Sequence, residues 1–229
     1  MSTHKLVVFD LDETLGQFSQ LSCFMTAVRA SSRIQIDIDR CVWLYPEVLR
    51  PGIIRCLTDI VDRMKLGEKI KVVLYTNNNG PPSWAVNIVK CLNAIVKFPV
   101  FSQVIPGHVG RGSCRTSMNK TISDLHRCVQ FPPGTKVCFV DDSDHPGMVH
   151  PAVYYIHVHP YYAPLKIDTM VNRLHSASRT RVPLQTFHLN ISQSLNSQQI
   201  PWTYQDQRSD TERLNELLLY NHLQIFLDS

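Results

Sequence analysis

The chain has 229 residues, of which 44% are apolar, and this is enough to fill the core of one full-sized domain with a modest appendage. Its formal charge of +4, from 23 basic and 19 acidic residues, is mild, and no run of like charges indicates a nucleic-acid or membrane surface. Residues 1–30 do not have the pattern of a secretory signal, and no apolar run reaches the roughly 18 residues of a membrane span. We therefore expect an intracellular protein, cytoplasmic or nuclear, that is not secreted, contacts no membrane and binds no nucleic acid directly.

The cysteines are scattered through the chain without a C-x-x-C pair. Their number is odd, and with this spacing it argues against a disulfide framework and against a zinc site. We expect them to be ordinary core or half-buried residues. The seven are Cys23, Cys41, Cys56, Cys91, Cys114, Cys128 and Cys138.

The first predicted element is a strand over Leu6–Phe9, an apolar run too short for a helix and bounded by charge. This pattern is typical of a strand buried on both faces of a parallel sheet. Ligands of open α/β sheets bind beyond the carboxyl ends of the strands, so Asp10 is in position for chemistry. Asp12 is two residues further on and can reach the same substrate. The simpler interpretation is an acidic turn in which Asp12, Glu13 and Thr14 cap a helix, but the D-x-D-x-T pattern behind a strand favours chemistry.

The next predicted unit repeats the order of strand and polar loop. Gly16–Val42 shows no clean hydrophobic period, which predicts an irregular flap over the strand end with a short helix near Cys23–Arg29. Apolar residues then recur at helical spacing over Ile53–Met64. Ile70–Tyr75 predicts a second buried strand, which ends in a dense cluster of turn-forming residues.

The middle of the chain continues to build a sheet. Trp84–Val96 has the pattern of an amphipathic helix, and Val100–Ile105 that of a short strand. Gly107–Met118 predicts a mobile basic loop, followed by a short helix around Lys120–Arg127. Val137–Val140 predicts a third clear strand, followed at once by acidic residues.

The last part of the chain has weaker patterns. Val153–Val158 predicts one more strand, after which periodicity fades over His175–Asp206, a region rich in Ser, Gln and Asn that we expect to be a loop or a wrapping arm. Ser209 and Glu212 form a capping box before a terminal helix that runs towards Leu227. Its apolar face must pack on the body or on a partner, and we favour the body. The helix opens with the apolar residues Leu214, Leu217 and Leu218.

Four features occur in a fixed order along the chain: the DLDET run at Asp10–Thr14, a threonine ending the second strand, an isolated lysine at a helix start, and paired aspartates ending a later strand. The last three are Thr76, Lys120 and Asp141 with Asp142. Taken alone, Thr76 is a turn residue and Lys120 a surface lysine. In this order the features resemble the four motifs of the haloacid dehalogenase (HAD) superfamily.

Within that superfamily the chain is similar to the FCP/SCP group of serine/threonine phosphatases, which are also called NIF-like and act on the tail of RNA polymerase II. The residues that carry this resemblance are LRPG at Leu49–Gly52, YTN at Tyr75–Asn77 and VDDS at Val140–Ser143. The resemblance covers roughly Lys5–Pro164. Gly16–Phe18 departs from the cellular members and is similar to homologues in large DNA viruses, which suggests a viral protein.

The resemblance implies an α/β fold, a HAD-like Rossmannoid doubly wound parallel sheet with a small flap. We expect a phosphatase domain over residues 1–165. Residues 166–229 would form a C-terminal extension with a terminal helix packed on the domain. The sequence does not determine the oligomeric state.

The expected reaction is hydrolysis of a phosphomonoester through an aspartyl-phosphate. Asp10 would attack phosphorus, and Asp12 would protonate the leaving alkoxide and then deprotonate the hydrolytic water. A carboxylate and a phosphate dianion repel, with each pair of unit charges at 4 Å costing about 4 kcal/mol at an effective dielectric of 20, so a cation is required. Mg²⁺ suits hard oxygen ligands and phosphate. The resemblance implies that Asp10, the Asp12 carbonyl and an acidic residue of the Asp141–Asp142 pair bind it, with Asp142 favoured as the direct ligand.

Phosphate itself would be bound by Thr76, with Asn77 beside it, and by Lys120, which supplies fixed positive charge. The expected substrate is a phosphoserine or phosphothreonine of a protein or peptide, with the tail of RNA polymerase II as one candidate. A small phosphate ester or a nucleic-acid terminus remains an alternative substrate, as does a non-catalytic binding module of the same fold.

Some further residues are weaker candidates. Four histidines are close in sequence, which makes a zinc site conceivable but disfavoured, because no matching cysteine or distant histidine pair supports it. Two arginines of the basic loop are either solvated or clamp a substrate phosphate, and three aromatic residues either line a groove or pack in the core. These residues are His145, His150, His157 and His159; Arg111 and Arg115; Phe18, Trp43 and Tyr45.

Overall fold

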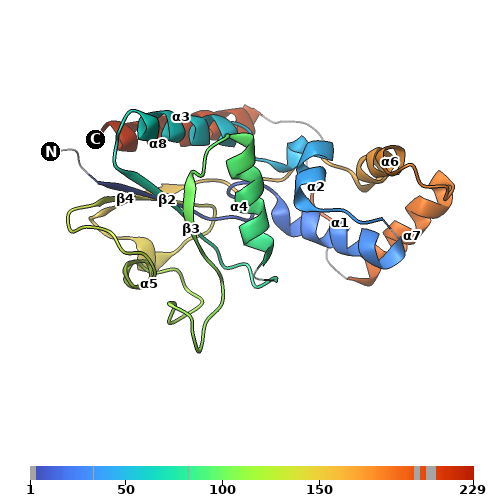
Figure 1. Ribbon diagram of the computed structural model, residues 1–229, viewed down its shortest axis with the longest axis horizontal. Helices are drawn as coiled ribbons and strands as arrows, with labels where there is room; N and C mark the ends of the chain where they lie inside the picture. Colours follow the sequence, from blue (N-terminus) through green and yellow to red (C-terminus); the bar gives the residue numbers. More distant parts are fainter. Residues whose placement is uncertain (1–3, 33, 82, 199–201, 205–209) are drawn as a thin grey trace.

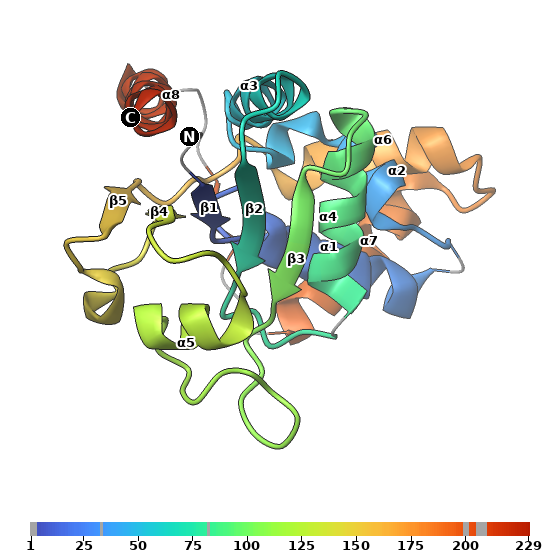
Figure 2. The ribbon, with the colours of Figure 1, turned by 60° about the vertical axis from the view of Figure 1, so that its left-hand side comes forward.

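The computed structural model describes residues 4–32, 34–81, 83–198, 202–204 and 210–229. Its centre is an all-parallel sheet with the strand order β3-β2-β1-β4-β5 (Figures 1 and 2). The strands are β1 (Lys5–Phe9), β2 (Ile70–Tyr75), β3 (Phe101–Ile105), β4 (Lys136–Asp141) and β5 (Val153–His157). This is a Rossmann-like order that reverses beside β1, which places a ligand site at the carboxyl ends of β1 and its neighbours.

Alternate residues of each central strand enter two different cores. In β1, Val7 and Phe9 point to the larger core and Leu6 and Val8 to the smaller one. The larger core is covered by α3 (Ile53–Lys65), α4 (Ser83–Ile95) and α8 (Asp210–Asp228), and the smaller one by α5 (Ile122–Cys128). The chain therefore has the expected doubly wound α/β fold, with helices on both faces of the sheet.

A lobe of helices extends from one end of the sheet (Figure 1). It consists of α1 (Phe18–Ser31), α2 (Ile38–Leu44), α6 (Ile167–Ser178) and α7 (Leu184–Ser197), with α1 and α6 both packed against α7. The flap expected over Gly16–Val42 corresponds to α1 and most of α2, so it is helical and not irregular. Helix α1 has 14 residues, twice the length of the short helix that the sequence predicted. Short 3₁₀ turns lie at Pro46–Val48 and Pro146–Met148.

The prediction of a loop over His175–Asp206 was wrong for much of that region. The end of α6 and all of α7 fall within it. On α7 the buried residues Phe187, Ile191 and Leu195 are four apart, so one narrow apolar stripe faces the lobe while Ser, Gln and Asn cover the rest. Because so few apolar residues are spaced among many polar ones, the sequence shows no clear helical period over α7.

The terminal helix α8 lies against α3 and β5, with Leu219, Leu223, Phe226 and Leu227 buried (Figure 2). The leucines that open the helix in the sequence, Leu214, Leu217 and Leu218, are about half exposed instead. Ser209 of the predicted capping box is outside the described residues. No helix in the described ranges is both long and apolar enough to cross a membrane.

The remaining predicted helices and strands lie where the sequence placed them, within a few residues at each end. The cysteines require a correction, because Cys114 and Cys128 form a disulfide. The pair is 14 residues apart, a spacing that matches no short motif, and the parity of the cysteine count does not reveal it. The other cysteines are buried or half-buried, as expected.

Candidate active site

The predicted site residues meet in a pocket of about 320 Å³ at the carboxyl ends of β1, β2 and β4. The register of the sheet causes this meeting. Phe9 pairs with Leu74 on one side and with Val140 on the other, so the strands on both sides of β1 end level with it. The pocket is lined by Asp10, Asp12, Glu13, Ser19, Thr76, Asn77, Asn78, Lys120, Asp141, Asp142, Ser143 and His145.

Lys120 lies just before α5 and joins the two strand ends. It is the residue before Thr121, whose hydroxyl accepts a hydrogen bond from the Asp124 amide and caps the helix. The Lys120 side chain is buried, and its ammonium forms ion pairs with Asp10 and, at 2.6 Å, with Asp141. One fixed cation thus lies between two strand-end carboxylates.

Asp141 and Asp142 have different surroundings. Asp141 is buried and accepts hydrogen bonds from Lys120 and from the Ser143 amide, while His145 lies 3.3 Å from it. Burial disfavours its charged form, but these donors outweigh burial and lower the pKa of Asp141.

Asp142 is less enclosed. Its carboxylate accepts a 2.6 Å hydrogen bond from the Thr14 hydroxyl, which in turn accepts from the Asp142 amide at 3.0 Å. Burial raises the pKa of Asp142, and the Thr14 hydrogen bond opposes the rise. Thr14 therefore fixes the residue that was favoured as the direct metal ligand.

Asp12 has one satisfied and one unsatisfied carboxylate oxygen. Its Oδ2 accepts a 2.8 Å hydrogen bond from Asn78, whereas its Oδ1 is buried without a hydrogen-bond partner. Burial raises the pKa of Asp12, against the opposing effects of Asn78 and Lys120. An unpartnered buried oxygen is costly in a folded protein and points to a group that acquires a partner only when a ligand is bound.

Thr76 lies opposite Asp12 at the end of β2. Its hydroxyl accepts a 3.0 Å hydrogen bond from the Asn78 amide, which leaves the hydroxyl proton for another acceptor. The neighbouring Asn77 uses its carbonyl oxygen to accept a hydrogen bond from Arg115, so its NH₂ group is the part of the side chain that can donate. Both residues line the pocket, as predicted.

Acidic side chains outnumber basic ones among the described residues that line the pocket. Five carboxyl side chains line it, those of Asp10, Asp12, Glu13, Asp141 and Asp142, against one lysine. Burial raises the pKa of Asp10 to about 8, with Lys120 opposing the rise and Asp141 adding to it. Two carboxylates at 4.8 Å repel by about 3 kcal/mol at an effective dielectric of 20. Ionising these neighbouring carboxyls together is therefore unfavourable unless a further cation lies among them.

The residues present fit a magnesium ion. Oxygens of Asp10, Asp141 and Asp142 lie within 4.8 Å of one another, close enough for a single cation to contact them. Carboxylate oxygens are the ligands that Mg²⁺ prefers. Among the described residues this is the one cluster of three metal-ligating side chains, and no histidine belongs to it.

Glu13 is a pocket residue that the sequence did not single out. Its backbone is left-handed, with φ of 58°, and its carboxylate accepts a hydrogen bond from Ser19. Burial raises its pKa to about 7, and Asp12 contributes to the rise. The buried guanidinium of Arg50 holds this turn by donating to the carbonyls of Thr14, Glu13 and His159 at 2.5 to 2.6 Å. The arginine of the LRPG run thereby shapes the loop that carries both catalytic candidates.

Arg115 does the same for the loops after β2 and β3. It is 3% exposed and donates to the carbonyls of Thr76, Pro106 and Met118 and to the side chain of Asn77. The interpretation of Arg115 as a solvated residue was wrong, and Arg115 is not among the described residues that line the pocket. A basic residue in a glycine-rich segment gave no signal of this role. Arg111 is exposed.

The other weak candidates lie outside the pocket, except His145. Phe18 and Tyr45 are fully buried, and the Tyr45 hydroxyl donates to the Met170 carbonyl at 2.8 Å. Trp43 is 76% exposed and is not a core residue. Within the described part of the chain, His157 and His159 belong to no cluster of metal-ligating side chains.

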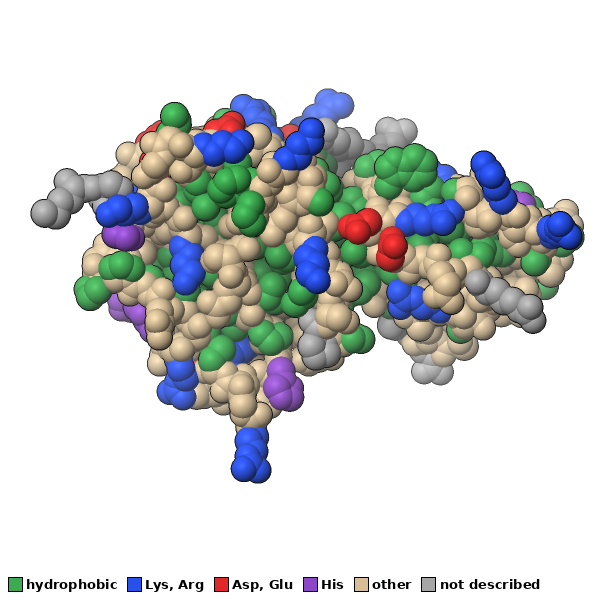
Figure 3. All heavy atoms as spheres, in the orientation of Figure 1, with side chains coloured by type: hydrophobic (Ala, Val, Ile, Leu, Met, Phe, Trp, Pro, Cys, Tyr) green, Lys and Arg blue, Asp and Glu red, His purple; other side chains and the backbone are tan. Residues whose placement is uncertain are grey.

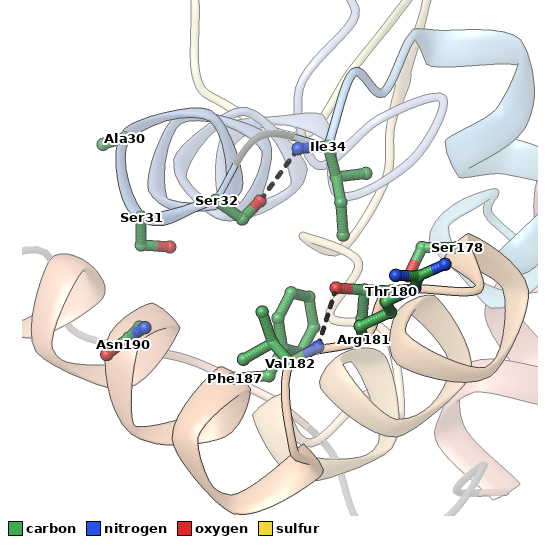
Figure 4. Close-up of a pocket in the computed structure, with 10 residues that line it drawn as sticks. All are labelled: Ala30, Ser31, Ser32, Ile34, Ser178, Thr180, Arg181, Val182, Phe187 and Asn190. Atoms are coloured by element: carbon green, nitrogen blue, oxygen red, sulfur yellow. Dashed lines mark hydrogen bonds between the residues drawn. The ribbon is translucent and has the colours of Figure 1, made fainter.

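Another pocket lies in the helical lobe, and Figure 4 shows the residues that line it. It measures about 740 Å³ and lies between the end of α1 and the α6–α7 turn, with Ile34, Val182 and Phe187 as its apolar residues and Arg181 at its edge. It contains none of the predicted site residues and no carboxylate. The lysines and arginines on the face shown in Figure 3 are dispersed and form no continuous basic band.

The parallel sheet and the ordered carboxylates, threonine and lysine at its edge define a HAD-like α/β protein. The model of the NLI interacting factor-like phosphatase family matches residues 5–181, which is most of the chain, and the chain belongs to this family. The match continues beyond Pro164 and includes α6. Neither a curated protein nor a solved structure matches the chain.

Proposed function

We propose that the chain is a magnesium-dependent phosphatase that hydrolyses phosphoserine or phosphothreonine in proteins through an aspartyl-phosphate on Asp10. The observation that carries this proposal is the pair of unlike carboxyls in one pocket. Asp10 lies against the Lys120 ammonium, whereas Asp12 is held through one oxygen and keeps the other unpartnered. Different environments for two neighbouring carboxyls are what separate nucleophile and acid/base roles need.

In the first step an Asp10 oxygen forms a bond to phosphorus, and the bond from phosphorus to the substrate oxygen breaks. The leaving alkoxide takes a proton, which Asp12 supplies because its raised pKa keeps it protonated more readily than a surface aspartate. In the second step Asp12 removes a proton from water, the resulting hydroxide forms a bond to phosphorus, and the bond from phosphorus to the Asp10 oxygen breaks. This step releases phosphate and restores both carboxyls to their starting states.

The remaining residues would bind the transferring group. Lys120 would supply fixed positive charge, and the Thr76 hydroxyl and the Asn77 NH₂ would donate hydrogen bonds to it, since both residues line the pocket. Magnesium, when bound, neutralises charge between the carboxylates and phosphate. Its direct ligands would be Asp10, the Asp12 carbonyl and Asp142. Asp141, which Lys120, Ser143 and His145 already contact, would stay behind the ion and hold Lys120 in place.

The test compares wild type with Asp10→Asn on phosphoserine peptides, an aryl phosphate and phosphorylated metabolites, each with and without magnesium. We expect turnover of the peptides only with magnesium and loss of turnover in the variant. Asp62→Asn is the matched control, since Asp62 is an exposed aspartate on α3. Absence of magnesium-dependent turnover on every substrate would exclude an enzyme. Activity on metabolites alone would exclude the protein substrate.

A further inference from the structure

Asn78 lies in the loop after β2, and both polar atoms of its side chain are hydrogen-bonded. The amide oxygen Oδ1 accepts from the Gly80 amide at 2.8 Å, and the NH₂ group donates to Oδ2 of Asp12 at 2.8 Å. Exchanging the two ends of the amide would place its NH₂ against the Gly80 N–H, so that two donors would face each other. The NH₂ group therefore faces Asp12 in the orientation that satisfies both partners.

The backbone of Asn78 is held as well as its side chain. Its N–H donates to the Thr76 hydroxyl at 3.0 Å, at the carboxyl end of β2. The loop after β3 packs directly against it, because a β-carbon at Gly107 would come within 2.8 Å of the Asn78 carbonyl oxygen. The position of the NH₂ group is thus set by the fold and does not depend on a bound substrate.

The contact with Asn78 makes the two oxygens of Asp12 unlike. Oδ2 faces an NH₂ group, which donates and cannot accept, so Oδ2 serves as the acceptor oxygen of the carboxyl group. Oδ1 is buried and has no hydrogen-bond partner among the described residues. A carboxyl proton is therefore better placed on Oδ1, and a leaving group in the pocket would be its first acceptor.

We propose that Asn78 is a positioning residue for the acid/base step: it holds Oδ2 of Asp12 and thereby makes Oδ1 the oxygen that exchanges the proton. The inference rests on the proposed phosphatase activity and adds a residue to it. In the first step the O–H bond at Oδ1 breaks, and the proton bonds to the leaving oxygen as its bond to phosphorus breaks. The electron pair stays on the Asp12 carboxylate, which the Asn78 NH₂ stabilises. Asn78 itself neither gains nor loses a proton.

The nature of the leaving group reports on this step. An alkoxide needs the proton as it departs, whereas a nitrophenolate does not. Benzyl phosphate and para-nitrophenyl phosphate are similar in size and differ in this respect, and kcat/KM for each reports the formation of the aspartyl-phosphate. The benzyl/nitrophenyl ratio of kcat/KM within one variant cancels any common loss of folding, metal binding or nucleophile, so it isolates the proton transfer.

The experiment measures this ratio with magnesium in wild type and in variants of the loop. Asn78→Leu keeps a branched side chain without the donor, and Asn78→Ala is a second variant with a smaller side chain. Each should lower the ratio by about 10 to 10²-fold, as for a misplaced catalytic group. Asp12→Asn should lower it by about 10² to 10⁴-fold. Asn79→Ala is the matched control and should keep the wild-type ratio, since Asn79 is the next residue of the loop and is exposed.

A double-variant cycle separates positioning from a general effect on the loop. Because Asn78 acts through Asp12, adding Asn78→Ala to Asp12→Asn should not lower the ratio further. A wild-type ratio in both Asn78 variants, or an equal further loss in the Asp12→Asn background, would overturn the inference and leave the phosphatase proposal intact. If wild type hydrolyses neither ester and no phosphoserine peptide, the phosphatase proposal itself fails.

Discussion

Magnesium binding should release a proton from the site and weaken as the pH falls. In the metal-free protein burial raises the pKa of Asp10 to about 8, with Lys120 opposing. A carboxylate must be ionised to bind Mg²⁺, so below this pKa the ion has to displace a proton. The sign follows directly: affinity is highest above the raised pKa and falls as the pH drops below it.

The size of the effect follows from the ionised fraction of Asp10. With a pKa of about 8, roughly three quarters of the side chain is ionised at about pH 8.5 and only about 3% at about pH 6.5. The dissociation constant for Mg²⁺ should therefore rise about 25-fold between these two pH values. Glu13, with its pKa near 7, lines the same pocket, and its protonation would add to the loss at the acidic end.

Calorimetric titration in two buffers of different ionisation enthalpy measures both quantities. Near pH 7 we expect about one proton released per ion in the Glu13→Gln variant, which isolates Asp10. Wild type and the surface control Asp62→Asn should release somewhat more, because Glu13 adds its share. Asp10→Asn should lose this release together with most of its affinity. Equal dissociation constants at both pH values, or no proton released by wild type near pH 7, would refute the reasoning.

Three further outcomes are expected. Asp12→Asn should reduce kcat on phosphoserine by about 10² to 10⁴-fold. The first step on an aryl phosphate should slow less, because its leaving group needs no proton, and a stopped-flow burst of aryl alcohol measures the rate of that step. Arg115→Met leaves the buried Thr76 carbonyl without this donor, so urea denaturation should show a loss of at least about 1 to 3 kcal/mol. Reducing the Cys114–Cys128 disulfide, which closes a loop with a sequence separation of 14, should cost about 3 kcal/mol in guanidinium denaturation, and the double Ala variant should not respond to reductant.

The sequence predicted the residues at the strand ends because parallel strands force those ends to one edge. A buried strand gives a clear apolar run, and the residue after it must lie at the carboxyl edge of the sheet. Asp10, Thr76 and Asp141 could therefore be brought together without knowing the strand order. Lys120 was predicted through its place between the motifs, since a lone lysine before a helix has no signature of its own.

The residues that hold these side chains were not predicted, because their partners are backbone atoms of distant loops. Asn78 was part of a run of turn-forming residues, and nothing in that run distinguishes the amide that contacts Asp12. The disulfide depends on a Cα separation of 5.0 Å between the loop and the end of α5, which sequence spacing does not reveal. Helix α7 was missed because its apolar stripe is one residue wide.

Two buried arginines explain how a pocket of mutually repelling carboxyls can be built at all. Arg50 and Arg115 donate to the carbonyls of the loops after β1, β2 and β3 and thereby fix the backbone without entering the pocket. Placing these guanidinium groups inside the site would have neutralised the carboxylates and removed the demand for a metal ion. Located outside it, they set the geometry of the loops and leave Lys120 as the one lysine or arginine among the described residues that line the pocket. The buried arginines therefore have a structural role outside the pocket, whereas Lys120 has a proposed catalytic role inside it. The sequence alone could not assign these roles, because all three residues are simply basic.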